Sequence, residues 1–217
     1  MNILRLNKEV HPIYWIDNFL SDDEIEKIKK YTRKIASVNA KVGDHTQEED
    51  KKPFTLDYHI KDPNIGLRDV PTTRITNLKW IQLNSETKWL FRKIIEQIHK
   101  VNQENFDLIL KFVEDLQFSE YTEKQKSFYA RHTDHGDLKL LHNYVDVRKL
   151  SFSIQLTDEK EYEGGDLVLY LEGREIKAPK SKGTIIFFES NIVHEVKPVK
   201  KGIRHALVSW VCGPNLR

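Results

Sequence analysis

Residues 127–137 read Ser-Phe-Tyr-Ala-Arg-His-Thr-Asp-His-Gly-Asp and place a histidine, His132, two positions before an aspartate, Asp134. The aromatic residues ahead of His132 favour a β-strand. Because side chains two positions apart on a strand point to the same face, the imidazole and the carboxylate are expected to project together. One nitrogen and one oxygen ligand side by side form part of the two-histidine, one-carboxylate set that holds non-haem Fe(II) with open positions.

A second histidine, His194, lies in a segment that also has the character of a strand, Ile-Val-His-Glu-Val-Lys-Pro-Val at 192–199. Ile192, His194 and Val196 share one face, so His194 is expected among apolar neighbours on the core side. A lone histidine in such a place is usually a core residue whose nitrogens are hydrogen-bonded. The next strand favours a ligand role for His194.

That next strand carries an arginine on the same face as apolar residues. Arg204 alternates in phase with Ala206, Val208 and Trp210, so it is expected to point inward. An unpaired charge in the interior is costly, and a guanidinium binds a carboxylate best as a bidentate pair. Few carboxylates of the chain are obvious partners, which indicates that a ligand supplies one. A 2-oxo acid that chelates iron at one end and carries a distal carboxylate for Arg204 is 2-oxoglutarate.

Two helices are predicted in the first half of the chain. Ser21 and Glu24 form a capping-box pattern ahead of an apolar stripe, which predicts a helix from about 22 to 36. A second helix, with its own apolar stripe, is expected to be capped by Asn84 or Ser85.

Short strands separated by glycine-containing turns are predicted around and after these helices, while 37–73 is expected to be a long loop. The predicted strands are 13–20, 74–83, 106–121, 128–134, 150–156, 166–171, 183–188, 192–199 and 204–211. Strands at this density indicate a sandwich or barrel. The predicted class is therefore α+β, with a double-sheet β core backed by N-terminal helices. The 217 residues fit one domain, with 1–105 as support and 106–217 as the catalytic core.

The composition excludes few classes of function, but it indicates the cellular compartment and the kinds of partner to expect. The chain has 35 basic and 33 acidic residues and a net charge of +2, which gives no general argument for a nucleic-acid or anionic-membrane partner. A single cysteine, Cys212, excludes an internal disulfide and fits a reducing compartment, where it is expected to be a small buried residue. No window has the length of a membrane span or the pattern of a signal peptide. A soluble, cytoplasmic protein is expected.

From about Phe106 onward, the sequence resembles the prolyl 4-hydroxylase-like branch of the Fe(II)/2-oxoglutarate-dependent oxygenases. The pattern in which His194 is followed by Pro198, Gly202 and Arg204 is highly specific to this family, whereas His-x-Asp alone is common. The other matching segments are 116–121, 128–134, 148–151, 162–167, 183–188 and 210–214.

The resemblance implies a double-stranded β-helix, or jelly roll, and a set of site residues. The iron ligands that it implies are His132, Asp134 and His194. Arg204 would pair with the distal carboxylate of 2-oxoglutarate, Tyr121 would hydrogen-bond the same group, and Tyr129 is expected in the wall of the same pocket. The implied reaction is hydroxylation of a C–H bond with O2 as oxidant and release of succinate and CO2. Ascorbate, which rescues oxidised iron, is implied as a further cofactor.

Several alternatives stay open at this point. The family name indicates a prolyl side chain in a peptide or protein, but other amino-acid side chains and small molecules are also possible substrates. A non-catalytic jelly-roll module that binds a metal, sugar or peptide is the alternative of another class. The second His-x-Asp pair, His135 and Asp137, is predicted to lie in a turn at the rim. His205 alternates to the face opposite Arg204, where packing is its expected role.

Overall fold

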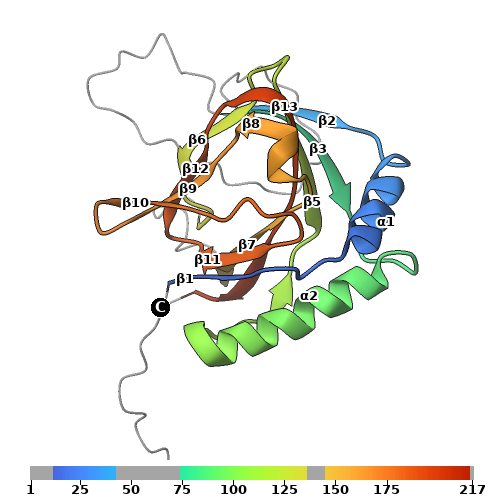
Figure 1. The fold of residues 1–217 in the computed structure, drawn as a ribbon. Coiled ribbons are helices and arrows are strands. Elements are labelled where there is room, and N and C mark those ends of the chain that lie inside the picture. Colours follow the sequence, from blue (N-terminus) through green and yellow to red (C-terminus); the bar gives the residue numbers. More distant parts are fainter. Residues whose placement is uncertain (1–11, 43–73, 136–144, 216–217) are drawn as a thin grey trace, which may run out of the picture.

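The computed structural model describes residues 12–42, 74–135 and 145–215. Within them, antiparallel strands form one strongly curled sheet, and two helices lie together along one side of it (Figure 1). This arrangement confirms the predicted α+β class with a jelly-roll core and helices from the N-terminal half. Most of the predicted loop 37–73 lies outside the described residues, as do Gly136 and Asp137.

Helix α1 (Asp22–Thr32) begins at the predicted capping box. The Ser21 hydroxyl accepts from the Glu24 amide at 3.3 Å, and the Glu24 carboxylate accepts from the Ser21 amide at 2.9 Å. These bonds satisfy two amides that would otherwise lack partners at the helix start. Ile25 and Ile28 are buried, so the apolar stripe packs against the sheet. The helix ends four residues before the predicted position.

Helix α2 (Lys88–Val101) starts later than the sequence predicted. Thr87 occupies the N-cap position, so the prediction of Asn84 or Ser85 as the cap is wrong. The Asn84 side chain instead accepts hydrogen bonds from the amides of Glu86 and Thr87, at 2.9 and 3.2 Å, and closes a turn ahead of the helix. This local bond competes with the helical path, which is the usual behaviour of asparagine near a helix start.

The end of α2 corrects a second prediction. The helix continues as a π-helical turn, Asn102–Phe106, which stops at Asp107 in the left-handed conformation with φ of 53°. Phe106 is therefore the buried end of that turn and not the start of a long strand. The predicted strand 106–121 divides into β4 (Phe112–Val113) and β5 (Leu116–Thr122).

The order of the remaining strands in the sheet differs from their order in the sequence. They are β1 (Ile13–Ile16), β2 (Val38–Val42), β3 (Arg74–Ile81), β6 (Phe128–His132), β7 (Asp146–Gln155), β8 (Tyr162–Gly164), β9 (Leu167–Leu171), β10 (Arg174–Lys177), β11 (Ile185–Glu189), β12 (Val193–Val196) and β13 (Val199–Pro214). The main path runs β1-β11-β7-β13-β5-β3-β6-β12-β9-β10, and β2, β4 and β8 pair at its sides. Strands β2, β8 and β10 were not predicted.

The sheet separates two interiors because successive side chains alternate between its faces. On β7, Leu150, Phe152 and Ile154 join the apolar cluster that also contains the buried residues of both helices. The intervening Ser151, Ser153 and Gln155 are also buried but face the inside of the curl. Strand β11 divides in the same way, since Ile185 and Phe187 belong to the first cluster and Ile186 and Phe188 to a second. The helices thus cover the outer face of the sheet, and the inside of the curl remains available for a functional site.

The last strand, β13, is longer than predicted. It runs without a break from Val199 to Pro214 and pairs with β8, β5, β7 and β4 in turn. The predicted turn at 200–202 is absorbed into it, with Gly202 at φ of 76°. A Cβ at Gly202 would lie 2.2 Å from the Glu161 carbonyl oxygen, so only glycine allows the residue just before β8 to approach this closely.

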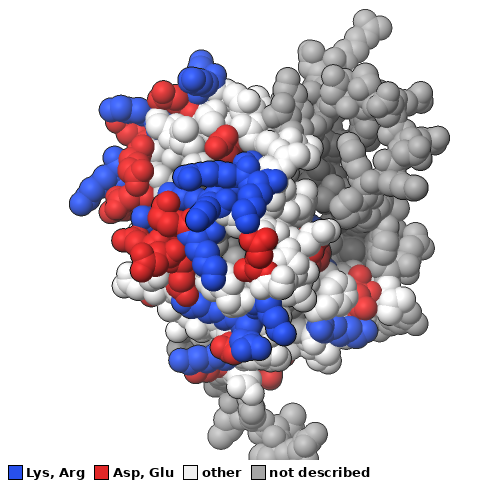
Figure 2. All heavy atoms as spheres, turned by 90° about the vertical axis from the view of Figure 1, so that its right-hand side faces the viewer, with Lys and Arg blue, Asp and Glu red and all other residues white. Residues whose placement is uncertain are grey.

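The helical side of the molecule carries charges of both signs. Figure 2 shows this face, where groups of Lys and Arg side chains lie beside groups of Asp and Glu. Ion pairs link α1 to its surroundings, including Lys93 with Glu24 at 2.6 Å and Lys182 with Asp22 at 2.8 Å. Among the described residues, no helix is long and apolar enough to span a membrane.

Replacing Phe152 by alanine is expected to lower the free energy of unfolding by about 3–5 kcal/mol, because it opens a cavity in the cluster beneath the helices. Phe152 is fully buried, whereas Phe112 is half exposed. Phe112→Ala serves as the control and should change stability by no more than about 0.5 kcal/mol. Chemical denaturation of both variants measures the difference, and equal losses would contradict the assigned core.

Candidate metal centre

The two histidines are brought together by the pairing of β6 with β12. His132 is the last residue of β6 and lies directly opposite His194 in the antiparallel register. Opposed residues on neighbouring strands point to the same face, and the two imidazole centroids are 4.2 Å apart. The register shifts between His194 and Val196, so the pairing is regular at the histidines and irregular just beyond them.

Asp134 reaches the same place by a different route from the one predicted. Strand β6 ends at His132, so the expectation that both side chains project from one strand is wrong. Asp134 lies in the bend after the strand, where its amide and that of His135 both donate to the Ser190 carbonyl oxygen at 2.9 Å. This anchor comes from the turn before β12 and folds the carboxylate back over the histidines.

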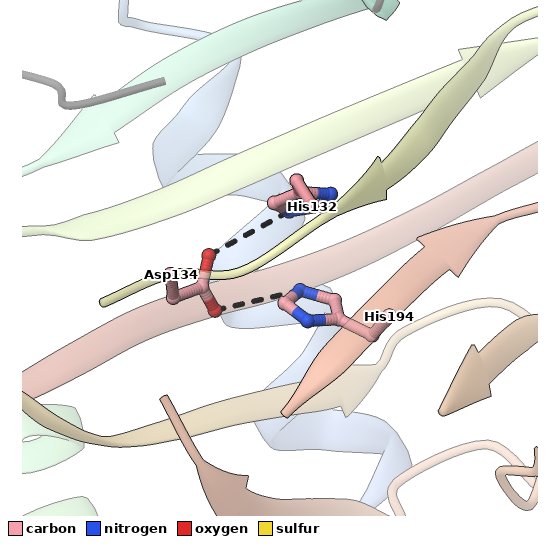
Figure 3. A group of neighbouring side chains, drawn as sticks. All are labelled: His132, Asp134 and His194. Atoms are coloured by element: carbon pink, nitrogen blue, oxygen red, sulfur yellow. Dashed lines mark ion pairs between the residues drawn. The ribbon is translucent and has the colours of Figure 1, made fainter. Parts of the chain in front are cut away.

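The three side chains converge on one point (Figure 3). The Asp134 carboxylate directs one oxygen to each imidazole, with Oδ1 at 3.6 Å from His132 Nε2 and Oδ2 at 3.5 Å from His194 Nε2. One potential ligand atom from each residue lies within 4.8 Å of the others, and all three side chains are buried.

Hydrogen bonds to the backbone fix which nitrogen of each histidine faces the centre. Nδ1 of His132 donates to the Ala130 carbonyl at 2.8 Å, and Nδ1 of His194 donates to the Ile192 carbonyl at 3.0 Å. A carbonyl oxygen only accepts, so in each neutral ring the proton is on Nδ1 and the lone pair is on Nε2. Metal-binding histidines are commonly oriented by such a bond from the nitrogen that does not bind the metal.

The centre therefore contains acceptors without a donor. Two imidazole lone pairs face the two oxygens of one carboxylate, and Asp134 Oδ2 is buried without a hydrogen-bond partner among the described residues. Such a cluster is repulsive unless a cation lies between its members. The residues fit a divalent metal of the kind held by two histidines and one carboxylate, with further positions left open.

The protonation states also suit a metal. Burial lowers the pKa of His194 to about 4, and the neighbouring His132 adds to this effect. Burial alone would raise the pKa of Asp134, but attraction to the two imidazoles in their protonated form and to the Arg148 guanidinium outweighs it and holds that pKa below its usual range. At neutral pH His194 is neutral and Asp134 is ionised, which is the state that metal coordination requires.

Arg204 lies deep in the same cavity and points inward, as the sequence predicted. Its side chain is among the largest that are fully buried, and Nη2 donates to Gln155 Oε1 at 3.0 Å. Tyr121 is opposite Arg204 in the β5–β13 register, with the guanidinium 5.3 Å from its ring centroid. Within the described residues, Arg204 forms no ion pair with a carboxylate. The cavity thus contains a buried positive charge, on Arg204, that the carboxylate of a ligand would neutralise.

The other predicted residues divide between the cavity and its surroundings. Tyr129 lines the cavity and stacks on His132, with ring centroids 3.5 Å apart. His135 does not join the ligand group. His205 faces away from Arg204, as predicted, and binds the Glu120 carboxylate at 3.0 Å. That hydrogen bond is the largest cause of the lowered pKa of Glu120, about 2.

Three polar residues near the centre were missed by the sequence reasoning. Gln155 holds Arg204, and nothing local distinguishes it from other strand residues. Arg148 forms a bidentate pair with Glu114 at 2.6 and 2.7 Å, and its partner is 34 residues away. Arg74 lines the cavity from β3. The alternation that singled out Arg204 applies equally to Arg74, so a signal for it was present.

Cys212 is buried, as expected. Burial and the nearby Glu114 carboxylate raise the pKa of its thiol to about 12, so it stays protonated. A protonated, buried thiol is a packing residue and not a nucleophile.

Known proteins share this fold and sequence pattern. Residues 116–212 match the family described as the 2OG-Fe(II) oxygenase superfamily. A PKHD-type hydroxylase of Alteromonas mediterranea is 34% identical over 43% of this chain and 41% of its own length. This confirms the predicted family resemblance. The aligned part spans less than two thirds of that relative, and its name identifies it as a hydroxylase.

Solved structures agree in fold at low sequence identity. A prolyl-4-hydroxylase of Pseudomonas putida superposes with a TM-score of 0.64 at 19% identity, over 94% of both chains. A prolyl hydroxylase of Trichoplax adhaerens, in complex with a hypoxia inducible factor peptide fragment, gives 0.64 at 18% identity over 92% of this chain and 83% of its own. The likeness therefore covers the N-terminal helices as well as the matched segment.

Gly165 is expected to be required for the position of Arg204. It has φ of 61°, and a Cβ there would lie 3.1 Å from Arg204 Cδ and 3.0 Å from Val199 Cγ2. Gly173 is a matched control, because its φ is 76° but nothing lies within 4 Å of the added Cβ. Both alanine variants carry left-handed strain, and Gly165→Ala should cost about 1–3 kcal/mol more by overpacking. Chemical denaturation tests this, and equal costs would show that Gly165 does not constrain Arg204.

Proposed function

We propose that the protein is an Fe(II)- and 2-oxoglutarate-dependent dioxygenase that hydroxylates a C–H bond. The observation that carries the proposal is the cluster of His132, Asp134 and His194, in which four acceptor atoms face one another without a donor. A structural metal site would be fully enclosed by protein ligands, whereas three ligands leave positions for reactants. The buried Arg204 beside it supports a dicarboxylate as one of these reactants.

Iron bound by these three residues would supply the oxidative decarboxylation of 2-oxoglutarate to succinate and CO2, with transfer of one oxygen atom of O2 to the substrate. The chain supplies the geometry for this chemistry. The backbone bonds at Nδ1 hold both imidazoles in one orientation, and the Ser190 carbonyl holds the Asp134 bend. Burial of the cluster excludes water from the reacting groups.

Arg204 is proposed to receive the distal carboxylate of 2-oxoglutarate. The Gln155 amide oxygen accepts a hydrogen bond from the Arg204 guanidinium and so orients it from one side. Because an amide oxygen is uncharged, the guanidinium keeps its positive charge available for a ligand. Tyr121, opposite Arg204, is proposed to donate its hydroxyl to the same carboxylate. The co-substrate would then bridge the cavity from Arg204 to the metal.

The substrate is proposed to be a prolyl or other amino-acid side chain, free or in a peptide. The prolyl hydroxylases of the same fold support this, one of them in complex with a peptide fragment. Ascorbate is proposed as a further requirement on the strength of the family resemblance. These assignments concern the substrate and cofactors, and they can fail without affecting the metal centre.

Anaerobic addition of Fe(II) and then 2-oxoglutarate should produce a visible metal-to-ligand charge-transfer band. The His194→Ala variant should give no band because it lacks one of the two imidazole ligands. In Arg204→Met the band should form at 2-oxoglutarate concentrations about 30-fold higher or more, because the variant loses a buried ionic contact. Titration followed by absorbance measures both effects.

The same titration separates the enzyme from a non-catalytic module. A wild-type protein that gives no band and never converts 2-oxoglutarate to succinate would favour a jelly-roll module that binds a metal or another ligand without turnover. Arg92→Met is a suitable control, because Arg92 is exposed on α2 and should leave the band unchanged.

A succinate-release screen over proline-containing peptides and free amino acids should identify the substrate class. A true substrate is expected to increase succinate formation above the uncoupled rate, and mass spectrometry should show one added oxygen atom. Stimulation without an added oxygen would indicate binding without hydroxylation. The Asp134→Ala protein serves as the control and should release no succinate.

A further inference from the structure

Arg74 is a second buried arginine in the cavity, and the proposed reaction gives it no role. It is the first residue of β3 and is 6% exposed. Its Nε and Nη2 are buried without a hydrogen-bond partner in the described parts of the chain. A guanidinium in this state is costly unless an anion binds it. Arg148 provides the contrast, because Glu114 neutralises it within the protein.

The setting of Arg74 repeats that of Arg204 on neighbouring strands. Arg204 on β13 is opposite Tyr121 on β5, and Arg74 on β3 is opposite Tyr129 on β6. Each guanidinium lies over the ring of its partner, at 5.3 Å and 4.5 Å from the centroid. Strands β5 and β3 are adjacent, so the cavity wall carries two arginine–tyrosine pairs side by side.

The two pairs differ in their contacts with the candidate metal ligands. Tyr129 stacks on His132, so Arg74, Tyr129 and His132 form a continuous stack that ends at the metal centre. Arg204 is not joined to the three candidate ligands by such a stack in the described parts of the chain, and it is held by Gln155. A ligand group on Arg74 would therefore lie close to the position where a substrate C–H bond must be presented.

The charges of the loaded cavity leave Arg74 unmatched. The charged residues that line this cavity, within the described chain, are Arg74, Asp134 and Arg204. Fe(II) and Arg204 together carry three positive charges, and Asp134 with the two carboxylates of 2-oxoglutarate carries three negative ones. One positive charge, that of Arg74, remains for the substrate. A singly charged carboxylate balances it, and its planar shape suits a guanidinium.

We propose that Arg74 binds a carboxylate of the substrate and selects for an acidic substrate. This inference rests on the proposed function, since it assumes that 2-oxoglutarate occupies Arg204. Arg74 acts here as a specificity-determining residue, and the substrate class is a molecule whose carboxylate lies near the C–H bond that is oxidised. A free amino acid, or a peptide whose acidic group lies next to the reacting residue, has this chemistry.

The test compares N-acetylated amino acids, proline among them, as free acids and as the matching amides. Calorimetry would measure their binding to the full-length protein loaded with Zn(II) and 2-oxoglutarate, and succinate release would measure turnover with Fe(II). In the wild-type protein at least one free acid should bind about ten- to a hundredfold more tightly than its amide. Arg74→Met should abolish this preference, and Arg74→Lys should retain part of it. Arg92→Met, at an exposed position on α2, should retain all of it.

Two further measurements separate this role from others. If Arg74 serves the substrate, the charge-transfer titration of Arg74→Met with 2-oxoglutarate should stay within about twofold of wild type. If its charge is unpaired in the free protein, Arg74→Met should unfold at the same temperature as wild type or higher, because an isosteric apolar side chain removes an uncompensated charge.

Several outcomes would overturn the inference. One is that no acid–amide pair is discriminated, including the case in which none of them binds. Another is that Arg74→Met weakens 2-oxoglutarate binding as Arg204→Met does, which would assign Arg74 to the co-substrate. A third is a lower unfolding temperature with the acid preference intact, which would make Arg74 structural. Absence of the charge-transfer band in the wild-type protein would instead mark failure of the proposed function.

Discussion

The register between β6 and β12 is the constraint on which the rest of the site depends. His132 and His194 face each other only in the observed pairing, and a slip of one residue on either strand would turn one imidazole to the opposite face. Strand β12 is also paired with β9 on its other edge, which fixes its position from both sides. The bend that carries Asp134 is tied to the Ser190 carbonyl, just before β12. One local register therefore sets all three ligand positions.

Taken alone, the polar interior of the curled sheet lowers the stability of the folded protein. It contains facing acceptor atoms, an ionised carboxylate and two arginines that no described carboxylate neutralises. The opposite face of the same sheet compensates for this loss of stability, because alternate residues of β7 and β11 pack with both helices in one apolar cluster. This division is common in enzymes, where a strained or polar site depends on stability generated elsewhere. The helices thus support the site without touching it.

Features that depend on strand alternation and on local capping could be predicted from the sequence. The inward phase of His194 and Arg204, the capping box at Ser21 and the overall class all depend on neighbours within a few residues. The wrong predictions depend on distant partners. Asp134 is placed by a carbonyl 56 positions away, and β2 is a strand only because β3 lies beside it. The π-helical turn at 102–106 likewise has no signal in the apolar pattern.

Three arginines in the described part of the sheet, two of them buried and Arg148 partly buried, have different kinds of partner. Arg148 is neutralised by Glu114 and stacked on Trp210, so it belongs to the architecture. Arg204 and Arg74 are at least as deeply buried, yet each lies over a tyrosine instead of beside a carboxylate. A tyrosine ring attracts a cation without satisfying its hydrogen bonds, so the guanidinium keeps its capacity for an anion. By this criterion the cavity can accept more negative charge than Asp134 and the proposed dicarboxylate provide, and we assign the excess to the proposed substrate.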